Sequence, residues 1–130
     1  MELNLLSSKI IKAAINVHKE LGPGLLESVY QSCMAIELSN MDLECQSEVP
    51  IPIIYQGQKV SDEGFRMDIL VENTIVVELK SVSKIQDVHK KQMLTYLKLA
   101  QKPLGLLLNF NETLMKDGIF RIINSQIAPV

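Results

Sequence analysis

The sequence predicts an α/β domain in which helices pack on a central mixed β-sheet. Segments with the three- and four-residue apolar period of a helix are followed by β-branched segments typical of strands. Two nearly continuous apolar runs, 75–79 and 104–110, are typical of strands covered on both faces. All 130 residues fit one domain, 1–130, because two separate cores would each lie near the lower size limit for folding.

Two helices are predicted in the first 40 residues. Apolar residues recur at helical steps over about residues 3 to 20, and Gly22-Pro23-Gly24 ends this first helix. A second helix begins near Glu27, which lies in its first turn, and ends at Ser39-Asn40. The helical step of this second segment is carried by Leu26, Val29, Cys33 and Ile36.

Three strands are predicted in the middle of the chain. Residues 43–55 form an edge strand, because two prolines remove ladder donors at alternate positions. After a turn at 56–58, residues 65–71 alternate, with odd-numbered side chains on one face and even-numbered ones, Asp68 included, on the other. A second hairpin leads into the central strand 75–79.

The last third of the chain predicts one helix and two strands. The helix covers about residues 85–100 and is ended by Pro103, after which the buried run 104–110 forms a strand. A turn at 116–118 precedes a short final strand, 119–123. The order of helix, helix, three strands, helix and two strands suits a mixed sheet with helices packed on it.

Composition excludes several classes of protein. Thirteen Lys and Arg against fifteen Asp and Glu give a formal charge of -2, which argues against a scaffold that coats DNA electrostatically. No apolar run approaches the roughly 18 residues of a membrane helix, and the N-terminus has no signal-peptide pattern, so a cytoplasmic protein without a membrane partner is expected. Cys33 and Cys45 are expected to be reduced thiols.

The candidate site of the sequence is built from Asp68, Glu78 and Lys80. Period two places Glu78 and Lys80 on one face of the central strand. If residue 71 pairs with 75 across a three-residue loop, Asp68 lies directly opposite Glu78, with Cβ atoms about 4.5 to 5.5 Å apart. A slip of one residue would turn Asp68 to the other face.

Two carboxylates held this close predict a divalent cation. They repel each other, and magnesium or manganese removes the repulsion with the hard oxygen ligands that both ions accept. Lys80 adds a positive charge suited to orienting water or stabilising a phosphoryl transition state. The alternative is a solvated strand end, in which Asp68 pairs with Arg66 or Lys80.

Further polar groups fall where the same site could use them. Glu27 lies where a helix dipole favours an anion, although such a residue is also common as a simple helix-start charge. In the third helix, His89, Gln92 and Tyr96 form one polar stripe, which a solvated helix face would also explain. His18, late in the first helix, fits either a ligand or a structural histidine.

With these residues the sequence resembles the GxxExxY protein family of the PD-(D/E)XK nuclease superfamily, from about Leu5 to Ile123. The name motif is met by Gly24, Glu27 and Tyr30, and Met67 replaces the proline of the superfamily signature. Further matching segments are 65–68, 77–80 and 89–97. The resemblance implies a restriction-endonuclease-like core with a central mixed sheet flanked by helices.

The resemblance also implies a role for each matching residue. Asp68, Glu78, the Leu79 carbonyl and Glu27 match metal-binding positions, and Lys80 matches the catalytic lysine. Gln92 and Tyr96 resemble the Q-x-x-x-Y signature of the RecB-like branch, which helps to place the substrate. Tyr30, Arg66 and His89 complete the expected substrate-positioning set, and His18 is a further candidate for phosphate contact.

The function expected on these grounds is a magnesium- or manganese-dependent nuclease that hydrolyses phosphodiester bonds in DNA, with RNA left open as a substrate. Local positive charge could come from Lys84, Lys90, Lys91 and Lys98. Two rivals remain at this stage. One is a catalytically silent module that binds nucleic acid or a protein partner, and the other is an oligomerisation domain that forms a homodimer.

Overall fold

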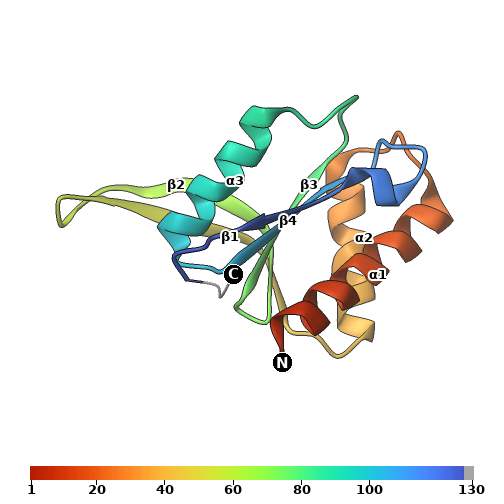
Figure 1. The fold of residues 1–130 in the computed structure, drawn as a ribbon, viewed down its shortest axis with the longest axis horizontal. Coiled ribbons are helices and arrows are strands. Elements are labelled where there is room, and N and C mark those ends of the chain that lie inside the picture. Colours follow the sequence, from red (N-terminus) through yellow and green to blue (C-terminus); the bar gives the residue numbers. More distant parts are fainter. Residues whose placement is uncertain (128–130) are drawn as a thin grey trace.

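A five-stranded sheet forms the middle layer of the molecule, and helices cover both of its faces (Figure 1). The computed structural model describes residues 1–127. The elements in chain order are α1 (Leu3–Leu21), α2 (Glu27–Asn40), β1 (Cys45–Tyr55), β2 (Gln58–Val71), β3 (Ile75–Lys80), α3 (Asp87–Ala100), β4 (Leu104–Asn109), the 3₁₀ turn η1 (Met115–Gly118) and β5 (Ile119–Ile123).

The sheet order is β1-β2-β3-β4-β5, and β3 pairs with β4 in parallel while the other neighbours are antiparallel. The predicted mixed α/β fold is therefore confirmed. The edge position of β1 is confirmed as well, and β3 and β4 are almost entirely buried, as their apolar runs predict. The strand β2 begins at Gln58, seven residues before the alternating segment expected from the sequence.

Two hydrophobic cores lie on opposite faces of the sheet. α1 and α2 pack on one face against alternate residues of β3 and β4, with Val77 and Leu106 among them. α3 packs on the other face through Met93 and Leu97, against Val76 and Leu107. Successive residues of β3 and β4 serve different cores, which explains why these strands have no polar face.

The face that α2 buries differs from the stripe that its sequence suggests. Tyr30, Met34 and Leu38 are fully buried. Leu26 and Ile36, by contrast, are 74% and 61% exposed. The rotation of α2 is set by contacts with distant segments, such as the Gln31 side-chain amide that donates to the Asp68 carbonyl, which no local apolar period reports.

The alternation expected along β2 fails near Asp68. Met67 belongs to the core beneath α3, whereas Ile69 and Val71 belong to the core beneath α1 and α2. On the neighbouring strand, Glu48 lies at the register position of Asp68 and has a left-handed backbone with φ 54°. This irregularity twists the hairpin, so odd-numbered residues on either side of Asp68 point to opposite faces.

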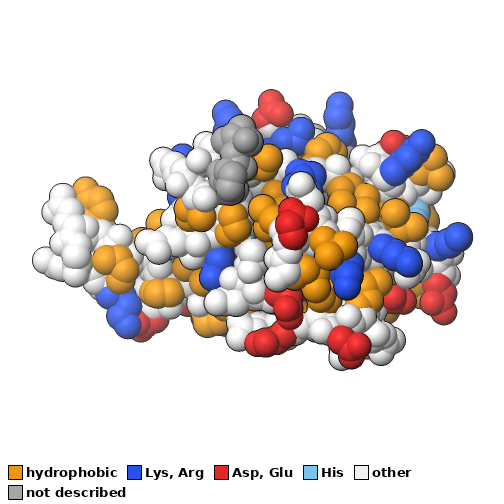
Figure 2. Space-filling view, turned by 60° about the horizontal axis from the view of Figure 1, so that its bottom comes forward, with side chains coloured by type: hydrophobic (Ala, Val, Ile, Leu, Met, Phe, Trp, Pro, Cys, Tyr) orange, Lys and Arg blue, Asp and Glu red, His pale blue; other side chains and the backbone are white. Residues whose placement is uncertain are grey.

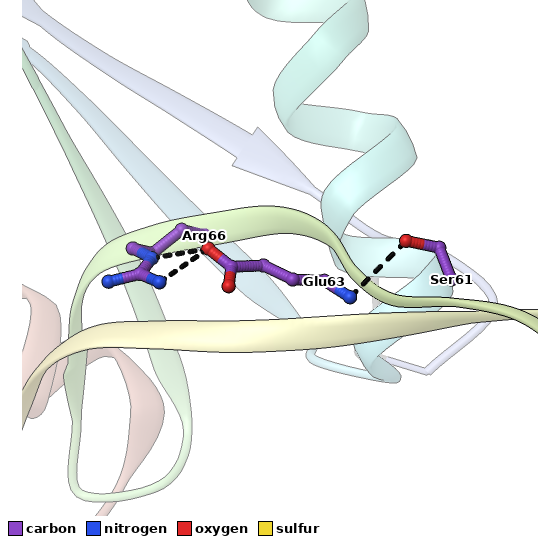
Figure 3. A network of polar contacts seen from close by, with 3 residues as sticks. All are labelled: Ser61, Glu63 and Arg66. Atoms are coloured by element: carbon purple, nitrogen blue, oxygen red, sulfur yellow. Dashed lines mark hydrogen bonds and ion pairs between the residues drawn. The ribbon is translucent and has the colours of Figure 1, made fainter.

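Beyond this twist, β1 and β2 form a two-stranded arm that projects from the body of the molecule (Figures 1 and 2). Its charged side chains pair with each other. Lys59 contacts Asp62 at 3.0 Å, and the Arg66 Nε–H donates to Glu63 Oε1 at 2.7 Å, beside the Ser61 hydroxyl that accepts from the Glu63 N–H (Figure 3).

Two further expectations concern membrane-spanning helices and the two cysteines. Within residues 1–127 no helix is long and apolar enough to cross a membrane. Cys33 and Cys45 are both free and partly buried, as expected of reduced thiols.

Candidate active site

Asp68 and Glu78 lie together where the β2–β3 ladder ends. The pairs Val71–Ile75 and Ile69–Val77 confirm the predicted register, which places Asp68 opposite Glu78. The Asp68 N–H donates to Glu78 Oε1 at 3.2 Å, and the Leu79 N–H donates to Asp68 Oδ2 at 2.8 Å. Each carboxylate therefore takes a main-chain donor from the opposite strand, and the backbone holds both acids in place.

The environment of the pair disfavours two negative charges. Glu78 is only 8% exposed, and burial raises its pKa to about 8, with the neighbouring Asp68 charge acting in the same direction. Burial also raises the pKa of Asp68, although the Leu79 N–H partly opposes this. Without a cation, the pair is expected to keep a proton near neutral pH. The reading as a solvated strand end is wrong, because Glu78 is buried and Arg66 pairs with Glu63.

Lys80 ends β3 two residues after Glu78 and is half-buried. Its positive charge opposes the rise in the Glu78 pKa, so the ammonium group acts on the same site. The backbone around it is fixed by β4, since the Phe110 N–H donates to the Lys80 carbonyl at 2.9 Å.

Asn109 is a supporting residue that the sequence analysis missed. Its buried side chain accepts from the Val82 N–H at 3.1 Å and donates to the Val82 carbonyl at 3.0 Å. These bonds hold the turn that follows Lys80. The available signal was a polar side chain inside the apolar run 104–110, a position where an amide must find buried partners.

Glu27 approaches the acids from the start of α2. Its carboxylate accepts from the Ser81 N–H at 3.4 Å, just after Lys80, and its charge raises the pKa of Asp68. Gln31, one turn later, donates to the Asp68 carbonyl at 3.1 Å. Glu48 is a second acid that raises the pKa of Asp68, and the sequence analysis missed it because only strand pairing brings it near.

Tyr30 supports the segment that carries Glu27. Its hydroxyl donates to the Gly22 carbonyl at 2.6 Å and accepts from the Leu25 N–H at 3.1 Å, and its ring stacks on Phe110 with centroids 4.4 Å apart. The side chain is fully buried. Both functions of the hydroxyl are therefore occupied within the protein, and Tyr30 acts on the site by fixing the backbone before Glu27.

We expect Tyr30→Phe to lower the free energy of unfolding by about 0.5 to 1.5 kcal/mol, because two part-buried backbone groups lose their hydrogen-bond partner. Urea unfolding measures this change. Tyr55→Phe is the matched control, since Tyr55 is 65% exposed on the arm and should leave stability unchanged. Equal stabilities of Tyr30→Phe and Tyr55→Phe would contradict the assigned role.

The polar residues of α3 serve different places: Tyr96 is on the side of the two acids, whereas His89 caps the start of the helix. Tyr96 is half-buried and stacks on Phe65 of β2, with centroids 4.0 Å apart. Burial and the charges of Glu78 and Asp68 raise the Tyr96 pKa, so the two acids act on its hydroxyl. Gln92 is exposed one turn earlier, and His89 Nδ1 accepts from the Gln86 N–H at 3.0 Å in a capping box.

His18 is engaged elsewhere. It is buried in α1, and its Nε2 lies 2.8 Å from the Glu112 carbonyl oxygen, which requires a proton on that nitrogen. This geometry is that of a structural histidine that ties α1 to the loop before η1.

The family model of the PD-(D/E)XK nuclease superfamily matches residues 4–122. The chain belongs to this superfamily. Proteins of the superfamily are typically nucleases, and the matched range contains Asp68, Glu78 and Lys80. No curated protein and no solved structure matches the chain.

PD-(D/E)XK nucleases generally use divalent metals, and the donor set of this chain fits one. Two carboxylates with raised pKa values carry negative charge that a cation would compensate, and magnesium often takes only one or two carboxylates and keeps several waters. Within residues 1–127, no three His, Cys, Asp or Glu side chains converge as a ready-made cage. The acid pair, which lies within the matched range, is a candidate centre for a metal site.

Proposed function

We propose that this protein is a magnesium- or manganese-dependent nuclease that hydrolyses phosphodiester bonds in DNA. The observation that carries the proposal is the acid pair Asp68 and Glu78, held by reciprocal main-chain bonds and too buried for both groups to ionise alone. A pair of carboxylates buried here without a ligand would lower the stability of the fold. A bound cation would instead compensate the negative charge of both groups.

In this proposal each residue at the end of β3 has a separate task. Asp68 and Glu78 would hold the cation together with the Leu79 carbonyl, and Glu27 adds negative charge near Asp68. A divalent cation held there would supply Lewis-acid chemistry, polarising a phosphate and lowering the pKa of an attacking water. Lys80 orients that water and stabilises the charge that develops on the phosphoryl oxygens.

The substrate is placed by the exposed side of α3 in the same proposal. Gln92 precedes Tyr96 by one turn of α3, and the charges of both acids act on the Tyr96 hydroxyl, which supports a place in the RecB-like branch. Gly24, Glu27 and Tyr30 support membership of the GxxExxY family. Arg66 and His89 remain proposed phosphate contacts, each of which would have to leave its present partner or share it. A cytoplasmic location is part of the same proposal.

Calorimetric titration of manganese tests the site without a known substrate. At pH 8 we expect the wild-type protein to bind the ion and Asp68→Asn to bind it at least about tenfold more weakly, because half of the carboxylate pair is lost. Asp62→Asn on the same strand is the control and should bind like the wild type, since Asp62 pairs with Lys59 on the exposed arm.

Equal binding by the wild type and Asp68→Asn would place the ion elsewhere and contradict the proposal. If the wild type binds manganese neither alone nor with a DNA oligonucleotide present, the silent nucleic-acid-binding module becomes the better account.

A further inference from the structure

A hollow opens beside the acid pair, where the loop between α1 and α2 meets the end of β3 and the loop that follows β4 (Figure 1). We call it the α2 hollow. It has a volume of about 540 Å³ and is lined by residues 24–28, Ser81 and Asn111. The Glu27 carboxylate, which belongs to this lining, accepts from the Ser81 N–H at 3.4 Å, and its charge acts on Asp68. A substrate bound at the acid pair therefore has the α2 hollow as a direct neighbour.

The wall of the α2 hollow is held in shape by the protein itself. The Leu25 N–H donates to the Tyr30 hydroxyl at 3.1 Å, and the Leu25 carbonyl accepts from the Ser81 hydroxyl at 2.9 Å. On the loop after β4, the Asn111 N–H donates to Oδ1 of the buried Asn109 at 3.2 Å. A ligand that enters a preformed site of this kind has little ordering entropy to overcome.

The lining combines apolar surface with uncharged polar groups. Leu26 is 74% and Leu25 39% exposed, and the exposed Asn111 amide offers both a donor and an acceptor. Glu27 supplies a negative charge, and within the described part of the chain no lysine or arginine belongs to the lining. A phosphate is disfavoured in such a place, because it would meet a carboxylate of the same sign. The α2 hollow therefore suits an uncharged group with an apolar face and a polar edge, and a nucleobase is such a group.

We propose that the α2 hollow binds the nucleoside attached to the scissile phosphate, with its base packed on Leu26 and the polar edge of the base at Asn111. This assignment rests on the proposed nuclease function and deepens it, because it adds a site for the base to the site for the phosphate. Lys80 and Ser81 are consecutive residues, so a nucleoside joined to a phosphate at Lys80 lies within reach of the hollow. The exposed Leu26 side chain gains a partner in this arrangement.

Amide NMR titration of the wild-type protein tests the assignment with deoxyadenosine 5′-monophosphate and, separately, with deoxyadenosine 3′-monophosphate. The two probes place the nucleoside on either side of the phosphate and contain no internucleotide bond that could be cleaved. With magnesium at pH 8, we expect at least one of them to shift the amides of residues 25–28, Ser81 and Asn111 saturably. Inorganic phosphate is the matched control and should leave the amides of Leu26 and Asn111 unshifted. Shifts confined to other residues, or no shift with either nucleotide, would overturn the proposal.

Two substitutions test the contacts with the base. Leu26→Ala and Asn111→Ala should each weaken binding of the mononucleotide by at least about threefold, because the first removes apolar contact and the second a hydrogen-bonding partner. Leu114→Ala is the matched control for Leu26→Ala, since Leu114 is 52% exposed before η1 and does not line the hollow. Wild-type affinity in both Leu26→Ala and Asn111→Ala would rule out the proposed contacts.

Manganese binding, measured on the same wild-type protein, separates the base-binding site from the proposed function. If the protein binds manganese but neither nucleotide shifts the amides of the hollow, the base-binding site is wrong while the ion site stands. If a nucleotide shifts these amides in a protein that binds manganese neither alone nor with DNA, the nucleoside site stands and the proposed metal-dependent hydrolysis is wrong.

Discussion

Lys80→Ala is expected to lower the rate of DNA cleavage by on the order of 10³-fold while manganese binding persists. In the proposed mechanism the lysine supplies a positive charge to the reacting phosphate, and loss of one such group typically has an effect of this size. The carboxylates proposed to hold the ion should remain in place, because their main-chain donors belong to Asp68 and Leu79. Cleavage of single- and double-stranded DNA with manganese, alongside calorimetry, separates the two effects.

Lys116→Ala provides the control for this experiment. Lys116 is exposed in η1, so removal of its charge should leave both cleavage and ion binding unchanged. A Lys80→Ala protein that cuts DNA at the wild-type rate would remove the lysine from the mechanism. If the Lys80→Ala protein loses both manganese binding and cleavage, Lys80 would be needed to maintain the ion site itself.

The second large effect concerns stability in the absence of metal. The Glu78 pKa is about 8 in the folded protein, whereas an unfolded chain gives it a value near 4.5. Between these values the folded state binds a proton that the unfolded state does not. The free energy of unfolding should therefore fall as pH rises from about 5 to 8, by at most about 1.4 kcal/mol per pH unit for this group.

Urea unfolding in EDTA, repeated across this pH range, measures the effect. The Glu78→Gln protein should lack the dependence, since an amide cannot ionise, and its stability relative to the wild type should increase with pH. Glu44→Gln, at an exposed residue just before β1, should follow the wild type. Parallel curves for the wild type and Glu78→Gln would show that Glu78 is already ionised in the metal-free fold.

Manganese is expected to reverse this trend. The ion favours the ionised carboxylates, so its stabilising effect should be larger at pH 8 than at pH 6. The same two proteins report it, because Glu78→Gln should gain little from the ion at either pH.

Much of the fold and the centre of the site follow from the sequence. The strands and their order along the chain are encoded locally, in β-branched runs and turn residues. This is why β3, β4 and the 72–74 loop could be predicted. The register of the β2–β3 hairpin follows from its loop length. That register alone places Asp68 opposite Glu78, with Lys80 on the same strand.

Only the tertiary structure decided the remaining features, because they depend on segments far apart in the chain. The face of α2 that is buried was set by contacts such as that of Gln31 with the Asp68 carbonyl, which leaves Leu26 and Ile36 exposed. The twist opposite Glu48 reversed the alternation of β2. The apolar periodicity of a helix indicates that it has a hydrophobic side, but the tertiary contacts of the helix determine which side faces the core.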